Sequence, residues 1–243
     1  MSRNIRRVLL SLIVLAAVIW VANLPTSIHV GVNGYFRQIH MPLYVKWTQF
    51  LARHYEYERL ARQITAGCRT EEEKVLAILR WTKSNLRNVP AGMPVCDDHT
   101  LYIIIRGYGM PGQFQDIFTT LCAYAGLPAF FGKAYDRQHN NKYNLSFVKL
   151  HGKWRVFDAY YGKYFKSSNG DIAAVEDILK DHSLIKGNGV DAIVINGIPY
   201  SDFYYTLDLS TARNGSTLRP YRQMPFQRIL YEIKKAFKIE KDE

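Results

Sequence analysis

The stretch RGYGMPGQFQDIFTTLCAYAGLPAFF, residues Arg106 to Phe131, decides the fold. A glycine-rich turn, Gly107-Tyr108-Gly109, leads into a helix that begins near Gly112, and Gly126-Leu127-Pro128 ends that helix. A cysteine at the start of such a helix would have a depressed pKa, because the helix N-terminus favours the thiolate. The residue at that corner is Pro111, which suits the first turn of a helix but cannot act as a nucleophile.

An apolar segment near the N-terminus has the length of a membrane anchor. Val8 to Ile28 contains no charged residue, and this segment is long enough to cross a bilayer. Arg3, Arg6 and Arg7 precede it, and this bias predicts an N-terminus in the cytoplasm and an exported remainder. We therefore expect a single-pass inner (cytoplasmic) membrane protein with its domain in the periplasm or outside the cell. A cleaved signal peptide is the alternative, although Ala22-Asn23-Leu24-Pro25 is a poor cleavage site.

The exported part is basic. Of 32 Lys and Arg, 3 precede the span, which leaves 29 against 21 acidic residues and a formal charge of +8. The expected partners besides the membrane are an anionic glycan, a lipid headgroup, a peptide or a protein in an envelope complex. Nucleic acid is not expected outside the cytoplasm. A well-solvated basic surface explains the same charge equally well.

The three cysteines allow at most one disulfide within the chain. Cys68 with Cys96 is the expected pair, because Cys122 lies in an apolar helical stripe where cysteine behaves as a small buried hydrophobe. The run Cys96-Asp97-Asp98-His99 has the side chains of a metal site or of a displaced nucleophile. A polar loop is the simpler interpretation, so no metal and no cofactor is predicted. The stripe consists of Phe114, Ile117, Phe118, Leu121 and Ala125.

The order of the expected elements favours an α+β fold. Met41 to Ile64 has helical periodicity, and Thr70 with Glu73 forms a capping box before a helix that ends near Leu86. Ala129 to Ala134 and a hairpin from Tyr143 to Asp158, which turns at His151-Gly152, follow as strands. Helices come first and strands later, which predicts a central helix packed on an antiparallel sheet.

Four segments follow from these expectations. Residues 1–28 form the cytoplasmic tip and the transmembrane anchor, and residues 29–70 form a helical linker region. Residues 71–208 form the main domain. Residues 209–243 form a basic arm and an amphipathic C-terminal helix, because Pro225 to Lys238 alternates apolar and basic residues at helical spacing.

These pieces resemble the transglutaminase-like superfamily, a branch of the papain-like cysteine enzymes. The core of that family is a Gly-x-Cys turn, a helix that ends in Gly-Ile-Pro, a strand that starts with His, and a strand that ends Gly-x-Trp-x-x-x-Asp. The matching pieces here are Gly109-Met110-Pro111, Gly126-Leu127-Pro128, Tyr143, and the run GKWRVFD from Gly152 to Asp158. The resemblance covers roughly Lys74 to Gly162.

The resemblance implies a catalytic triad of which only the aspartate is present. In the family the cysteine attacks an amide carbonyl, the histidine activates the thiol and the aspartate orients the imidazole. The corresponding positions here are Pro111, Tyr143 and Asp158, so no intact catalytic residue set is expected. A two-residue turn at His151-Gly152 would place Leu145 opposite Asp158 and Tyr143 on the same face as Asp158. With a pKa of roughly 10, a tyrosine is a poor general base.

We therefore expect a membrane-anchored pseudoenzyme that acts as a non-catalytic binding or scaffold module in envelope or polysaccharide assembly. One alternative is an active thiol amidase, protease or acyl transferase that uses a displaced nucleophile such as Cys96. Another is a structural subunit of a membrane complex. The expected ligand-binding groove consists of Gln113, Tyr143, Trp154, Asp158, Tyr160 and Tyr161.

Overall fold

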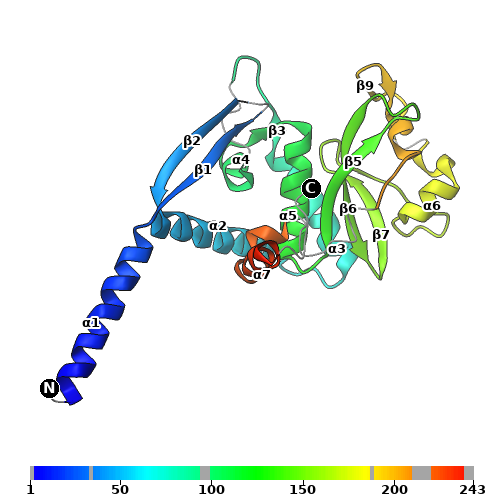
Figure 1. The fold of residues 1–243 in the computed structure, drawn as a ribbon. Coiled ribbons are helices and arrows are strands. Elements are labelled where there is room, and N and C mark those ends of the chain that lie inside the picture. Colours follow the sequence, from blue (N-terminus) through cyan, green and yellow to red (C-terminus); the bar gives the residue numbers. More distant parts are fainter. Residues whose placement is uncertain (1–2, 33–34, 94–98, 187–188, 210–219, 238–243) are drawn as a thin grey trace.

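The computed structural model describes residues 3–32, 35–93, 99–186, 189–209 and 220–237, and it has mixed α and β structure (Figure 1). The helices are α1 (Arg3–Ala22), α2 (Leu43–Ile64), α3 (Glu71–Asn85), α4 (Thr100–Arg106), α5 (Pro111–Tyr124), α6 (Val175–Lys180) and α7 (Pro225–Ala236), with short 3-10 helices η1 (His182–Ile185), η2 (Tyr200–Tyr204) and η4 (Tyr221–Gln223). The strands are β1 (Pro25–Val32), β2 (Tyr35–Pro42), β3 (Arg87–Asn88), β4 (Tyr108–Gly109), β5 (Ala129–Tyr135), β6 (Lys142–Leu150), β7 (Lys153–Asp158), β8 (Lys163–Tyr164), β9 (Val194–Ile195) and β10 (Ile198–Pro199).

Helix α1 projects from the rest of the molecule, and none of its residues is buried (Figure 1). By length and composition it is a candidate membrane span, as an anchor or as a signal sequence. The helix ends at Ala22, so the last part of the expected span, Val8 to Ile28, is not helical. The side chain of Asn23 donates to the carbonyl of Ile19 (2.8 Å), and β1 begins at Pro25, which cannot continue the hydrogen bonding of a helix.

A β-hairpin replaces the first part of the expected helical linker. Strands β1 and β2 pair antiparallel from Pro25 opposite Pro42 to Val32 opposite Tyr35. The β-branched residues Ile28, Val30 and Val32 alternate with smaller or polar ones in β1, and this alternation favours a strand.

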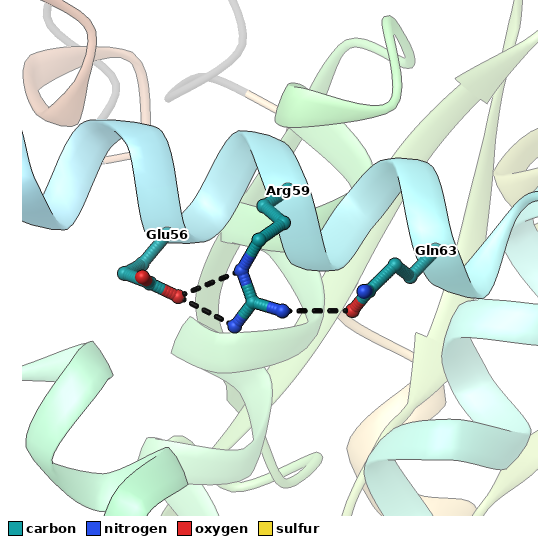
Figure 2. A network of polar contacts seen from close by, with 3 residues as sticks. All are labelled: Glu56, Arg59 and Gln63. Carbon is teal, nitrogen blue, oxygen red and sulfur yellow. Dashed lines mark hydrogen bonds and ion pairs between the residues drawn. The ribbon is translucent and has the colours of Figure 1, made fainter.

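Helix α2 follows the hairpin directly, close to the predicted bounds. Its buried residues Tyr57 and Ala61 face the domain. On its exposed face Arg59 contacts Glu56 and Gln63, at 2.7 and 3.2 Å (Figure 2). This helix therefore packs on the domain with one face and leaves the other in solvent.

The capping box before α3 is confirmed. The Thr70 hydroxyl accepts from the backbone of Glu73 (3.1 Å), and the Glu73 carboxylate accepts from the backbone of Thr70 (3.2 Å). Helix α4 was not predicted, because proline and glycine dominate the sequence just before it. It ends at Gly107, whose left-handed backbone (φ 72°) suits glycine.

The main sheet has the strand order β5-β6-β7-β8, and each neighbouring pair is antiparallel. Helix α5 covers one face of this sheet, where Phe118 and Leu121 pack with Val148 and Phe157. The chain after β8, with α6 and η2, covers the other face (Figure 1). The predicted α+β fold, with a central helix on an antiparallel sheet, is confirmed.

The predicted hairpin turn is also confirmed. Leu150 pairs with Lys153, so His151 and Gly152 are the two turn residues, and both have positive φ (49° and 81°). Cys96, Asp97 and Asp98 lie outside the described residues, as does most of the expected basic arm. Helix α7 confirms the C-terminal helix that the sequence predicts.

Candidate functional site

The first turn of α5 is capped by the side chain of Gln113, which lies within that turn. Pro111 occupies the first helical position, where its missing N–H costs nothing. The side-chain oxygen of Gln113 accepts from the backbone N–H of Met110 (2.9 Å) and from the guanidinium of Arg106 (3.2 Å). Gln113 is therefore buried and caps the helix, rather than lining a groove as expected.

Strand β6 approaches this turn closely at Gly112. A Cβ atom on Gly112 would lie 2.7 Å from the side-chain nitrogen of Asn144, so a larger residue at this position would require the amide to move. As the hairpin register predicts, Asn144 points to the opposite face of the sheet from Tyr143. The strand residue that faces the helix start is therefore an amide and not an imidazole.

The carboxylate of Asp158 is fully buried at the end of β7 and accepts five hydrogen bonds. Oδ2 accepts from the hydroxyls of Tyr143 (2.9 Å) and Tyr200 (2.8 Å). Oδ1 accepts from the side-chain amide of Gln115 (3.0 Å) and from the backbone N–H groups of Tyr160 (2.9 Å) and Tyr161 (3.1 Å). Five donors occupy the acceptor sites of a carboxylate, so this aspartate is held entirely by the protein.

Gln115 extends this network toward the middle of the sheet. Its side-chain oxygen accepts from the hydroxyl of Ser146 (2.7 Å) and from the backbone N–H of Ala159 (3.1 Å). Tyr200 in turn contacts Tyr204 through their hydroxyls (2.5 Å). The network therefore joins α5, β6, the end of β7 and η2.

Burial dominates the electrostatics of the network. It raises the pKa of the Asp158 carboxyl, and the hydrogen bonds from the tyrosines and Gln115 act in the opposite direction. Burial and the nearby Asp158 charge together raise the pKa of Tyr143 far above the usual range of tyrosine. Tyr143 therefore donates to Asp158, and its raised pKa makes it a poor general base at neutral pH.

The predicted contact between Tyr143 and Asp158 is present, but it lies in the interior of the domain. Tyr143 is 7% exposed and Asp158 is 0% exposed. Sequence reasoning missed Gln115 and Tyr200. Gln115 lies one turn after Pro111 on the face of α5 that packs on the sheet, so its spacing was the available signal. Tyr200 comes 42 residues after Asp158 in a 3-10 helix, and no local pattern indicates the contact.

Of the remaining groove residues, Tyr160 and Tyr161 lie side by side with ring centroids 4.8 Å apart, and the ring of Tyr161 lies 6.5 Å from that of Tyr143. Trp154 pairs with Lys149 toward the hairpin turn and packs edge to face on Phe130, with centroids 5.1 Å apart. Tyr160 packs in the same manner on Phe114 at 5.1 Å. Tyr161 lines a cavity of about 340 Å³ between α3 and β8, which Lys83 and Tyr164 also line. The structure therefore brings four of the six expected residues together, Asp158 with Tyr143, Tyr160 and Tyr161. Gln113 and Trp154 make the separate contacts described above.

Two cysteines are described. Cys122 is buried, and burial raises the pKa of its thiol well above the usual value. Cys68 is half-buried and forms no disulfide with another described cysteine. Because Cys96 lies outside the described residues, its pairing with Cys68 stays a prediction. Within the described ranges, no group of three or more His, Cys, Asp and Glu side chains could hold a metal ion.

Comparison with known families gives one match. A family model described as the transglutaminase-like superfamily matches residues 58–168. No curated protein matches the sequence.

Solved structures of similar proteins share low identity with this chain. A Cytophaga hutchinsonii protein, provisionally described as a cysteine protease, is 21% identical with a TM-score of 0.39, over 50% of this chain and 42% of its own. A Parabacteroides distasonis protein, provisionally described as a protease, is 13% identical with a TM-score of 0.35, over 63% and 40%. A TGase is 16% identical with a TM-score of 0.40, over 90% and 63%. The chain thus covers less than two thirds of each of these proteins.

Proposed function

We propose that this chain, whose residues 58–168 match the transglutaminase-like superfamily, is a membrane-anchored, non-catalytic member of that superfamily. It acts as a binding or scaffold module on the outer side of a cytoplasmic membrane. Helix α1 is the anchor, and the domain takes part in assembly of the cell envelope.

The observation that carries this proposal is the state of Asp158. An aspartate that serves catalysis leaves an oxygen free to hold the imidazole of a general base. Here both oxygens of Asp158 are occupied, and Oδ2 accepts from Tyr143 and Tyr200, two buried tyrosines whose pKa values are raised by burial. The same carboxylate therefore holds the fold together, and Pro111 supplies no thiol at the helix start.

The cavity at Tyr161 supplies a candidate binding face. Tyr161 and Tyr164 offer aromatic rings, and Arg80 and Lys83 of α3 bring positive charge to the same wall. Aromatic rings beside cations suit an extended anionic ligand, because the rings stack on apolar faces while the cations pair with acidic groups. The ligand that we propose is an anionic glycan.

Alkylation by iodoacetamide over a range of pH tests the loss of thiol chemistry. The full chain is purified in detergent, and the labelling of Cys68, Cys96 and Cys122 is mapped by mass spectrometry. We expect that none of the three reacts rapidly at or below neutral pH, because a free thiol is a weak nucleophile unless its pKa is depressed. Denatured protein, in which all reduced thiols react, is the control for detection.

Rapid labelling of Cys96 at or below pH 7 would overturn the proposal. It would identify a displaced nucleophile and an active thiol amidase, protease or acyl transferase. A disulfide between Cys68 and Cys96, or slow labelling of both, supports a domain without a reactive thiol.

A further inference from the structure

A second, larger cavity lies on the side of the domain that carries β1 and α2, and no residue of the Asp158 network lines it. It has a volume of about 720 Å³ and lies between α2, β1, α4 and α7. This volume is in the range of cavities that hold small organic ligands, roughly 300–1,000 Å³. No residue of the transglutaminase-like motifs lines it.

Apolar side chains form most of its walls. Trp47 and Phe50 come from α2, Val30 comes from β1, and Ile229 and Ile233 come from α7. Trp47 is 41% exposed, and both isoleucines are 47% exposed. The apolar face of the amphipathic α7 is therefore not fully covered by the domain, which leaves an apolar slot between α2 and α7.

Cations lie within this apolar slot. The Nε atoms of Arg53 and Arg222 are buried, line the cavity and have no hydrogen-bond partner among the described residues. The nearby Glu232 is already paired with Arg228 (2.5 Å). Leaving a guanidinium donor buried without a partner is costly, so these two side chains favour an anionic group in the cavity.

The cavity also lies beside the anchor. The backbone N–H of Leu43 donates to the carbonyl of Leu24 (2.9 Å), which ties the start of α2 to the end of α1. The cavity wall begins at Ile28, three residues along β1 from Pro25, a rise of about 10 Å. Helix α1 leads directly into β1 and lies beside the start of α2, two elements that line the cavity (Figure 1). If α1 spans the bilayer, the cavity therefore lies near the lipid headgroups.

We propose that this cavity binds an anionic phospholipid from the membrane that holds α1. One acyl chain lies between Trp47, Phe50 and the apolar face of α7, and the phosphate oxygens accept from Arg53 and Arg222. The apolar walls match the chain, and the two unpaired guanidinium donors match the phosphate. This proposal rests on the membrane anchoring in the proposed function, but it does not depend on the loss of catalysis.

Native mass spectrometry of the full chain in detergent tests the site. The chain is incubated with phosphatidylglycerol or with phosphatidylcholine that carries the same acyl chains. We expect one phosphatidylglycerol to be retained per chain, at least about tenfold more tightly than phosphatidylcholine. The double variant Arg53→Gln/Arg222→Gln should lose this preference.

Arg59→Gln is the matched control. Arg59 lies on α2 like Arg53, but it is paired with Glu56 on the exposed face of the helix (Figure 2). It should retain phosphatidylglycerol as the unmodified chain does. Ile233→Ser keeps both arginines and replaces a half-exposed residue, so it should fold and should weaken retention through the acyl chain alone.

Three results would overturn the site. They are equal retention of the two lipids, unchanged retention by the double variant, and displacement of the lipid by an equal concentration of glycerol phosphate. The last result would mean that the cavity binds a free anion and that the acyl chain plays no part.

Extraction of membranes with alkaline carbonate tests the membrane anchor separately from the lipid site. A chain that resists extraction but retains no lipid keeps the anchor and refutes the lipid site. A chain that carbonate releases but that still retains phosphatidylglycerol refutes the anchor and leaves the cavity as a lipid site.

Discussion

At the scale of single residues, Asp158 is the centre of a buried hydrogen-bond network. Its carboxylate accepts from tyrosine hydroxyls, a glutamine amide and two backbone N–H groups. A buried carboxylate that loses any of these donors loses stabilisation that water cannot replace. The network therefore contributes to the stability of the fold.

Replacement of Tyr143 measures this contribution. Tyr143→Phe removes one hydrogen bond to a buried carboxylate and keeps the ring, so it should lower the free energy of unfolding by about 1.5–3 kcal/mol. Urea unfolding of the full chain in detergent, followed by circular dichroism, gives the value. Tyr55→Phe is the control, since Tyr55 is 61% exposed on α2 and its loss should change stability by less than about 0.5 kcal/mol. Equal stability of the two variants would contradict a structural role for the hydroxyl of Tyr143.

The pairing of Tyr143 with Asp158 could be predicted from sequence, but the rest of the network could not. A two-residue turn at His151-Gly152 fixes the register of both strands, and the register fixes which side chains share a face. Tyr200 reaches the carboxylate through the long connection after β8, and such a contact has no periodicity. The burial of the network could not be predicted either, because a residue pattern does not show that the chain after β8 covers this face of the sheet.

At the scale of secondary-structure elements, the strongest local signals gave the most accurate predictions. The capping box of Thr70 and Glu73 and the apolar stripe of α5 predicted their helices closely. The β1–β2 hairpin was missed because its first residues were assigned to the membrane span on hydropathy alone. Apolar β-branched residues support either structure, and the contacts with α2 decide between them.

The cavity that α3 and β8 form at Tyr161 is the proposed glycan site. Arg80→Ala and Tyr161→Ala should each weaken binding of an anionic oligosaccharide about tenfold, the usual cost of truncating an arginine or tyrosine at the centre of a binding face. Ligands are selected on a glycan array, and affinities are then measured by titration with the full chain in detergent. Arg80 is exposed, so its removal should leave the fold intact.

Arg62→Ala provides the comparison for charge. Arg62 is an exposed arginine of α2 that lies 4.0 Å from Glu58 and does not line the cavity. Binding that is equally tight in Arg80→Ala and Arg62→Ala would refute this face as the glycan site. Selection of acidic peptides instead of glycans would redirect the ligand class but keep the site.

At the scale of the whole molecule, the proposed anchor and the arginines before it predict an orientation in the membrane. Helix α1 has three arginines at one end, and at the other end the chain enters β1 and α2, where the larger cavity begins. The positive-inside bias favours the arginines in the cytoplasm. The lipid site would then contact the outer leaflet, and the cavity at Tyr161 would belong to the domain outside the cytoplasm.

Protease digestion of sealed vesicles tests this orientation. If α1 crosses the bilayer once with its arginines in the cytoplasm, the domain should be digested in right-side-out vesicles and protected in inside-out ones. Detergent opens both kinds of vesicle and is the control for intrinsic resistance to the protease. The mass of the membrane-bound chain, 28.1 kDa if α1 is retained, is measured in the same preparation. Digestion only in inside-out vesicles would reverse the orientation. A mature chain that begins after Ala22 would identify α1 as a signal sequence. The lipid site needs the uncleaved helix, because that helix holds the domain and its basic cavity at the membrane surface.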